Sequence, residues 1–342
     1  MSDIIQDFAD YRIRSIELAE AKYYESLIKT LDNIEKQITS LAGKTLPTDD
    51  LGRLFDLKIA VSMQPKIRTI LEKEYLAWSD TVVREGFNKQ AKRIEKAFKG
   101  IKVAKEFQQL TNADLTLITN LKRQTFTQFK DVSNTMTRRL TEKIYQATLT
   151  SVEFVELEKD LRQTINGIYA RADDKQVNKL VNSIKKDEVK LKKVRRNSIA
   201  GKKLRQKLDN NIQVLQSKFA RDRAGENMKR YAGQILNDSL REFDAQLNLA
   251  KSKDAGLTYL KYQGSLIPTS RDFCRVVRSG GYDIRKNGLF TIDEVKRLWS
   301  SRGWKGKKSG NPLIVRGGYN CRHQWSYVNP DWYDKAGNLI IE

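Results

Sequence analysis

Apolar residues recur at helical spacing along most of the first part of the chain. From Ser2 to Ala42 there is neither proline nor glycine, and apolar side chains follow one another at steps of three and four. Such steps place side chains on one face of a helix. The residues on this face are Leu27, Leu31, Ile34, Ile38 and Leu41. The pattern predicts a long helix that ends at Gly43.

Further helical stripes follow. One helix is expected to begin near Pro65, because proline suits the first turn of a helix. Another stripe runs from about Asp114 to Asn166, and a last one covers residues 225–253. Stripes of this kind are typical of the core of a helical bundle. We therefore expect these residues to pack in a core or dock on a partner, and we assign no catalytic or ligand-binding role to them.

The pattern changes near Gly256. Residues 257–263 alternate as a short strand does, and short strands are also expected at Leu313–Val315 and Gln324–Val328. Between them, Thr291 and Glu294 have the spacing of a capping box at the start of a helix.

The predicted fold class is therefore mainly α: a long helical N-terminal region followed by a small α+β C-terminal domain. We expect a long-helix bundle region at 1–170, a strongly basic helical or linker segment at 171–224, and the α+β domain at 225–342, including its preceding helix.

Composition adds a strong positive charge to this picture. The 342 residues include 64 Lys and Arg against 42 Asp and Glu, a formal net charge of +22. Such a surface most simply matches a polyanion, because Lys and Arg that neutralise phosphates release condensed counterions. The acidic first residues are unlike a secretory signal, and no stretch approaches the apolar length of a membrane span. Nucleic acid or an acidic protein surface is the expected partner, and no membrane is required.

The positive charge is concentrated between Lys185 and Lys207, where only Asp187 and Glu188 oppose it. A solvated helix pair with a turn at 197–201 would explain this segment, and so would an arm that contacts phosphates. No aromatic residue interleaves it, so contacts are expected with the nucleic-acid backbone and without sequence preference. The candidate DNA phosphate contacts are Lys185, Lys186, Lys190, Lys192, Lys193, Arg195, Arg196, Lys202, Lys203, Arg205 and Lys207.

The two cysteines and the single histidine of the chain lie in its C-terminal part. Cys274, Cys321 and His323 offer two thiols and an imidazole, which zinc accepts as ligands. A fourth protein ligand would have to be Asp272 or come from a neighbouring subunit. A disulfide, or two packed thiols beside a hydrogen-bonded histidine, would explain the same residues. We expect the three residues to pin the loop 264–312 onto the final hairpin, with no cofactor unless zinc is bound.

Signatures of an enzyme active site are not found in the sequence. One histidine excludes most general-base arrangements, and the Gly-Lys-Lys-Ser string around Lys307 lacks the spacing of a phosphate loop. In a strand, Cys321 and His323 would point the same way without facing each other, and no orienting acid is evident. We therefore expect no catalytic residues and no enzymatic activity.

Several C-terminal segments together resemble a known family. They are AGLTYLKYQ, then TSRDFC at 269–274, a glycine-bearing loop, a TIDEV helix and GYNCRHQW at 318–325. This order is similar to the C-terminal domain of the Mu-F-type minor head proteins of tailed bacteriophages. The resemblance covers roughly residues 225–342, and Val277 stands where many relatives carry the second residue of a Cys-x-x-Cys or Cys-x-x-His pair.

The resemblance implies a structural virion protein: a minor head component that acts in head morphogenesis at the portal, inside the capsid. Its implied partners are the portal protein or the inner capsid and packaged double-stranded DNA, with which it would travel at ejection. Several copies per virion are expected, and the host cytoplasm is its expected location during assembly. Two alternatives stay open, namely a nucleic-acid-binding protein outside virions and a hydrolase or nuclease effector that carries this domain.

Overall fold

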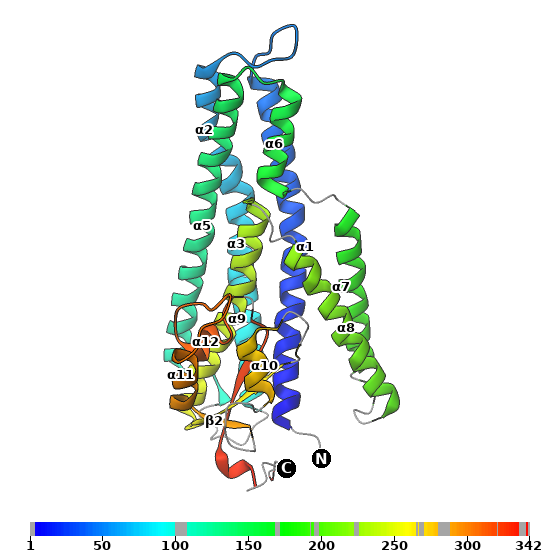
Figure 1. Cartoon of the computed structure of the whole chain (residues 1–342), viewed down its shortest axis with the longest axis vertical. Helices are drawn as coiled ribbons and strands as arrows, with labels where there is room; N and C mark the ends of the chain where they lie inside the picture. Colours follow the sequence, from blue (N-terminus) through cyan, green and yellow to red (C-terminus); the bar gives the residue numbers. More distant parts are fainter. Residues whose placement is uncertain are drawn as a thin grey trace. The chain divides into compact units, whose positions relative to one another are not determined.

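The computed structural model describes residues 4–99, 108–167, 172–191, 193–194, 198–221, 226–264, 266, 270–279, 288–319, 321–334 and 340. Its described part is mainly helical, with a three-stranded antiparallel sheet near the C-terminus (Figure 1). The predicted fold class is thus confirmed.

Long helices make up most of the described chain. The first elements are α1 (Ile4–Thr45), α2 (Leu57–Leu71), the π-helical turn η1 (Glu72–Leu76), α3 (Ala77–Thr81), the π-helical turn η2 (Val82–Gly86) and α4 (Phe87–Phe98). The next are α5 (Asn112–Leu149), α6 (Phe154–Asn166), α7 (Ala172–Leu191), α8 (Ile199–Arg221) and α9 (Met228–Asp254). The C-terminal part contains β1 (Tyr259–Gln263), α10 (Asp272–Ser279), β2 (Leu289–Thr291), α11 (Ile292–Ser300), α12 (Pro312–Val315), β3 (Gln324–Val328) and the 3-10 turn η4 (Pro330–Trp332).

The chain divides into two compact units that are both discontinuous in sequence. The first unit combines Met1–Glu17, Glu85–Lys122 and Asn237–Glu342, and the second combines Leu18–Arg84 and Arg123–Leu236. The predicted segments 1–170, 171–224 and 225–342 are consecutive, whereas each compact unit draws on both halves of the chain. Helices α1, α5 and α9 contribute residues to both units.

The second unit has a core of apolar and aromatic side chains from its helices. Tyr75 stacks on Trp78 with ring centroids 5.7 Å apart, and Phe129 of α5 meets the Trp78 ring edge to face at 5.5 Å. The indole Nε1 of Trp78 donates to Ser26 Oγ at 2.9 Å, so its polar atom is satisfied. The predicted stripe of residues 27–41 therefore faces a buried core, and so do Ile67, Leu71, Tyr75 and Val82 in the region of the helix expected near Pro65.

Three predicted helix boundaries were wrong. Helix α1 continues through Gly43, where a Cβ would lie 3.2 Å from Phe154 Cζ, so this glycine makes room for a ring instead of ending the helix. Helix α2 begins at Leu57, capped by the Asp56 side chain that accepts from Ile59 N, and Pro65 lies inside it. The expected helix over 114–166 is two helices, and Ser151 between them has a φ of 50°.

Helices α7 and α8 of the second unit pack against each other as a helical hairpin. Ile184 and Leu208 are buried, and the exposed Lys207 pairs with the buried Asp187 at 2.8 Å. The predicted helix pair is confirmed over the described residues. The expected turn at 197–201 was too long: Asn197 lies outside the described residues, and residues 199–201 already belong to α8.

The sheet of the first unit has the strand order β2–β1–β3, with β1 antiparallel to both neighbours. The predicted strands at 257–263 and Gln324–Val328 correspond to β1 and β3, but β2 was not predicted. Leu313–Val315 is not a strand: Asn311 caps a short helix, α12, by accepting from Leu313 N, and Pro312 occupies its first turn. The capping box of Thr291 and Glu294 at α11 is present as predicted.

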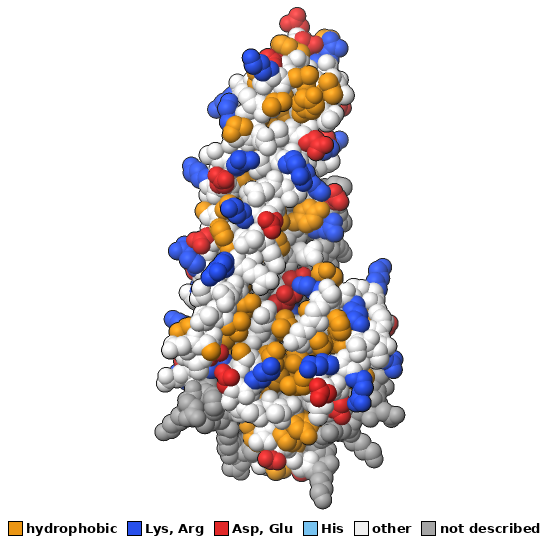
Figure 2. Space-filling model, turned by 90° about the vertical axis from the view of Figure 1, so that its left-hand side faces the viewer, with side chains coloured by type: hydrophobic (Ala, Val, Ile, Leu, Met, Phe, Trp, Pro, Cys, Tyr) orange, Lys and Arg blue, Asp and Glu red, His pale blue; other side chains and the backbone are white. Residues whose placement is uncertain are grey.

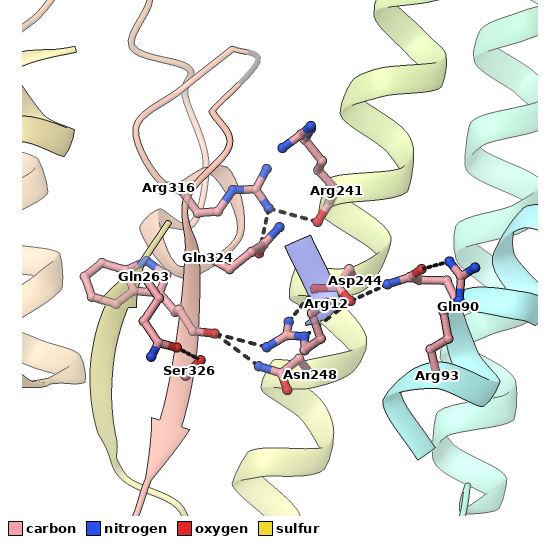
Figure 3. A network of polar contacts seen from close by, with 11 residues as sticks. Arg12, Gln90, Arg93, Arg241, Asp244, Asn248, Gln263, Arg316, Gln324 and Ser326 are labelled. Carbon is pink, nitrogen blue, oxygen red and sulfur yellow. Dashed lines mark hydrogen bonds and ion pairs between the residues drawn. The ribbon is translucent and has the colours of Figure 1, made fainter. Parts of the chain in front are cut away.

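A buried polar network connects four elements of the first unit (Figure 3). The guanidinium of Arg12, on α1, pairs with the carboxylate of Asp244, on α9, and also faces Trp325 O of β3 at 3.5 Å. Gln90 of α4 donates to Asp244 Oδ1 at 2.7 Å, and Asn248 Nδ2 donates to Trp325 O at 3.3 Å. The network holds the first turns of α1 against the sheet and α9, which are more than two hundred positions away in sequence.

Candidate functional site

The structure brings Cys274, Cys321 and His323 together in the first unit. One potential ligand atom from each residue lies within 4.8 Å of the others. All three residues are buried, with exposed fractions of 2%, 2% and 3%. We call these residues the thiol–imidazole cluster.

Three separate segments deliver the cluster. Cys274 lies on the buried face of the amphipathic helix α10, beside Phe273 and Val277. Cys321 follows a tight turn in which its N–H donates to Gly318 O at 3.1 Å. His323 immediately precedes β3. The motif segments around 274 and 321 that carried the resemblance thus meet at one point.

The two thiols are close but not bonded. Their Sγ atoms lie 3.6 Å apart, whereas a disulfide holds them at about 2.05 Å. Cys321 Sγ is 3.9 Å from His323 Nδ1. Because Cys321 lies in the turn before β3 and not in a regular strand, its side chain meets the imidazole instead of running parallel to it.

Tyr262 of β1 is a central member of the site that the sequence did not predict. Its hydroxyl lies 3.4 Å from each of the two sulfur atoms. Its ring stacks on His323 with centroids 5.1 Å apart and 13° between the planes, and packs on Trp325 at 4.4 Å. Tyr262 pairs with Trp325 across the β1–β3 ladder, so sheet register decides where its hydroxyl points.

The environment shifts the pKa values of the two thiols in opposite directions. The hydrogen bond to Cys321, together with burial, raises the pKa of Cys274. Burial alone would also raise the pKa of Cys321, but the hydrogen bonds from Cys274 and His323 and the charge of Arg316 lower it well below its ordinary value. Burial raises the pKa of Tyr262. The surroundings therefore shift the pKa values of the two thiols in opposite directions, upward for Cys274 and downward for Cys321.

Glycines allow the backbone to approach the cluster closely. A Cβ on Gly317 would lie 2.5 Å from Cys274 Sγ and 3.1 Å from Cys321 Sγ. At Gly264, where φ is +127°, a Cβ would lie 3.0 Å from His323 Cδ2. The cluster is thus enclosed by main chain on two sides, which excludes bulk water.

Asp272 is not the fourth member of the cluster, contrary to the sequence-based expectation. It is exposed at the start of α10, and the described group of metal-ligand residue types holds only the two cysteines and the histidine. A helix turns by about 100° per residue, so the buried position of Cys274 directs a side chain two positions away toward solvent.

Hydrogen bonds from the loop side chains connect the motif segments. Arg271 donates to the main chain at Lys305 O, 3.2 Å away, and at Tyr319 O. The indole of Trp304 donates to Gly317 O at 2.7 Å. Lys307 donates to Trp299 O at 2.6 Å and lies over the Trp299 ring, so this lysine closes a loop and is not presented to a phosphate. These contacts join the described parts of the loop 264–312 to the turn before β3.

The predicted phosphate-contacting residues that the structure describes lie on α7, on α8 or, for Lys193, between them in the second unit. Lys192, Arg195 and Arg196 are outside the described residues, and Arg205 is half-buried. Exposed side chains are found at Lys185, Lys186, Lys190, Lys193, Lys202, Lys203 and Lys207. Elsewhere, on the face drawn in Figure 2, Lys and Arg side chains lie among Asp and Glu and form no continuous basic stripe.

A scan against protein-family models finds no match for this chain, and searches of curated proteins and of solved structures find no significant match either. Among the described residues, no helix has both the length and the apolar character needed to cross a membrane.

Proposed function

We propose that the protein is a structural virion component: a minor head protein that acts in head morphogenesis at the portal of a tailed bacteriophage. The observation that carries the proposal is the convergence of the resembling segments. AGLTYLKYQ contributes β1, TSRDFC opens α10, TIDEV starts α11 and GYNCRHQW leads into β3. These segments, which were recognised by their residues, order and spacing, lie in one compact unit, and three of them contribute side chains to the cluster or contact it.

The burial of the cluster supports a role in structure and not in catalysis. A nucleophile must reach its substrate, yet Cys321 is 2% exposed and His323 is 3% exposed. The hydrolase or nuclease alternative would need a different set of residues, and the described chain provides no second cluster of metal-ligand residue types.

Contact with packaged double-stranded DNA is the second part of the proposal. The exposed lysines of the α7–α8 hairpin support it, because they offer several charges between residues 185 and 207, a stretch of the sequence without aromatic residues for base stacking. The same feature would suit a nucleic-acid-binding protein outside virions, which is the second candidate function.

Mass spectrometry of virions purified from the phage or prophage that encodes the chain tests the proposal. We expect its peptides in particles that also contain the portal protein, and in portal-containing assembly intermediates from lysed cells. Absence of these peptides at a depth where the portal is well covered would contradict the virion role. If the free protein then co-purified with nucleic acid from the cells, the second candidate would replace the first.

A further inference from the structure

We propose that the thiol–imidazole cluster binds one zinc ion and that the Tyr262 hydroxyl is its fourth ligand. The first three donors are the two cysteine sulfurs and His323, and Tyr262 replaces the fourth ligand that the sequence left unassigned. This inference does not depend on the proposed virion role, because it rests on the geometry of buried side chains in the first unit alone.

Four of the six distances between the proposed donor atoms are close to those of a tetrahedron around zinc. Bond lengths of about 2.3 Å to sulfur and about 2.0 Å to nitrogen or oxygen require ligand–ligand edges of about 3.8 Å between sulfurs and about 3.5 Å between sulfur and a lighter atom. The observed edges are 3.6 Å between the sulfurs and 3.4 Å from each sulfur to the Tyr262 oxygen. The distance from Cys321 Sγ to His323 Nδ1 is 3.9 Å. These four edges lie within about 0.4 Å of the tetrahedral values, and the ligand atoms of Cys274 and His323 lie within 4.8 Å of each other, so the imidazole would move toward Cys274 on binding.

The chemistry of the donors also fits zinc. Two thiolates balance the charge of a divalent cation, so the bound site would bury no net charge. Binding would release the protons of both thiols, because the thiolate is the form of cysteine that zinc accepts.

The enclosure of the cluster assigns a structural and not a catalytic role to the ion. A catalytic zinc keeps one position open to water or substrate, whereas here the tyrosine hydroxyl fills that position and its ring covers the imidazole. The ion would add a direct link between α10, β1 and the turn before β3.

The test uses the full-length protein purified under reducing conditions. After dialysis against metal-free buffer, we expect about one zinc per chain by elemental analysis. Cobalt(II) in place of zinc should produce a thiolate-to-cobalt charge-transfer band and the intense visible bands of tetrahedral coordination. Cys274 and Cys321 are the only two cysteines, so both should become resistant to thiol reagents when metal is bound and reactive when a chelator removes it.

Two matched variants distinguish a ligand role of Tyr262 from a role in packing alone. Tyr262→Phe keeps the ring but removes the donor, so we expect zinc affinity to fall about tenfold or more and the cobalt spectrum to lose tetrahedral character. The control is Tyr327→Phe, which removes another buried hydroxyl of the same sheet. This hydroxyl lies outside the cluster and has no hydrogen-bond partner among the described residues. Its loss should leave the zinc affinity and the cobalt spectrum unchanged. Cys321→Ser should abolish binding.

Three results would overturn the inference. One is reduced, folded wild-type protein that binds neither zinc nor cobalt. Another is a Cys274–Cys321 disulfide in the protein purified without reductant, together with no metal uptake after reduction. The third is zinc affinity in Tyr262→Phe equal to that of the wild type, which would remove the tyrosine from the ligand set.

Discussion

Arg12 and Asp244 form a buried ion pair that joins two helices far apart in the sequence. Their side chains are 1% and 0% exposed, and they come from α1 and α9. Removing two charges from water is costly, so such a pair is favourable only while both partners remain. Asp244 also accepts from Gln90, which makes this carboxylate the centre of the network in Figure 3.

Asp244→Asn should therefore destabilise the protein by about 3 to 5 kcal/mol, because Arg12 would keep its charge in a buried place without the carboxylate that faces it. Urea unfolding followed by circular dichroism measures the change. The matched control is Asp80→Asn, which breaks an exposed pair with Arg84 and should cost less than about 1 kcal/mol. Equal effects of the two variants would show that the buried network does not stabilise the first unit.

Among the elements, α11 is the one whose start could be predicted from local sequence alone. Thr291 Oγ1 accepts from Glu294 N at 3.2 Å, and Glu294 Oε2 accepts from Thr291 N at 2.6 Å. Thr291 also ends β2, so the same residue terminates a strand and caps a helix. The capping residues are neighbours in sequence, which is why a pattern was sufficient.

Thr291→Ala should lower the free energy of unfolding by about 1 kcal/mol through the loss of the cap. Thermal or urea unfolding of the full chain gives this number. Thr119→Ala is the comparison, because Thr119 is an exposed residue inside α5 whose hydroxyl donates only to Leu115 O. A cost for Thr291→Ala no larger than that of the comparison would mean that the capping box does not matter for stability.

At the scale of the whole molecule, the net charge of +22 affects binding of a polyanion according to which Lys and Arg side chains are exposed. Local pairs absorb part of it, as Lys207 does with Asp187 and Lys89 does with Glu85. Other exposed lysines of the α7–α8 hairpin remain on its surface, and these are the charges that a polyanion would meet.

Exchange of Lys185, Lys186, Lys190 and Lys193 for Glu should weaken binding to double-stranded DNA equally for unrelated sequences. Each neutralised phosphate contributes about −0.9 to the slope of log K against log salt, so the loss of four contacts should flatten the slope by roughly 3 to 4. Fluorescence anisotropy across a salt series measures both effects.

The control for this experiment exchanges Lys58, Lys66, Lys73 and Lys130 for Glu. These lysines are also exposed and belong to the same compact unit, so the change in net charge is identical. A similar slope in both variants would mean that binding depends on total charge and not on the hairpin. Unchanged DNA binding in the hairpin variant, with loss of assembly onto the portal, would assign the lysines to an acidic protein partner.

The sequence by itself determined the features that depend on near neighbours. Period and spacing along the chain predicted the helical character, strands β1 and β3 and the capping box. These features arise from contacts over a few positions, where the backbone geometry is regular and side-chain direction follows from spacing.

Only the tertiary structure decided which distant residues meet. Strand β2, with three residues, exists because β1 offers it an edge, and Tyr262 reaches the sulfurs because the β1–β3 register places it beside the turn of Cys321. The position of Asp272 on the exposed side of α10 excluded it as a ligand. The boundaries between the compact units fall inside helices, where the sequence pattern continues without a break. Contacts of this kind depend on strand register and on packing between segments that are far apart in the sequence, so the periodicity of the sequence does not predict them.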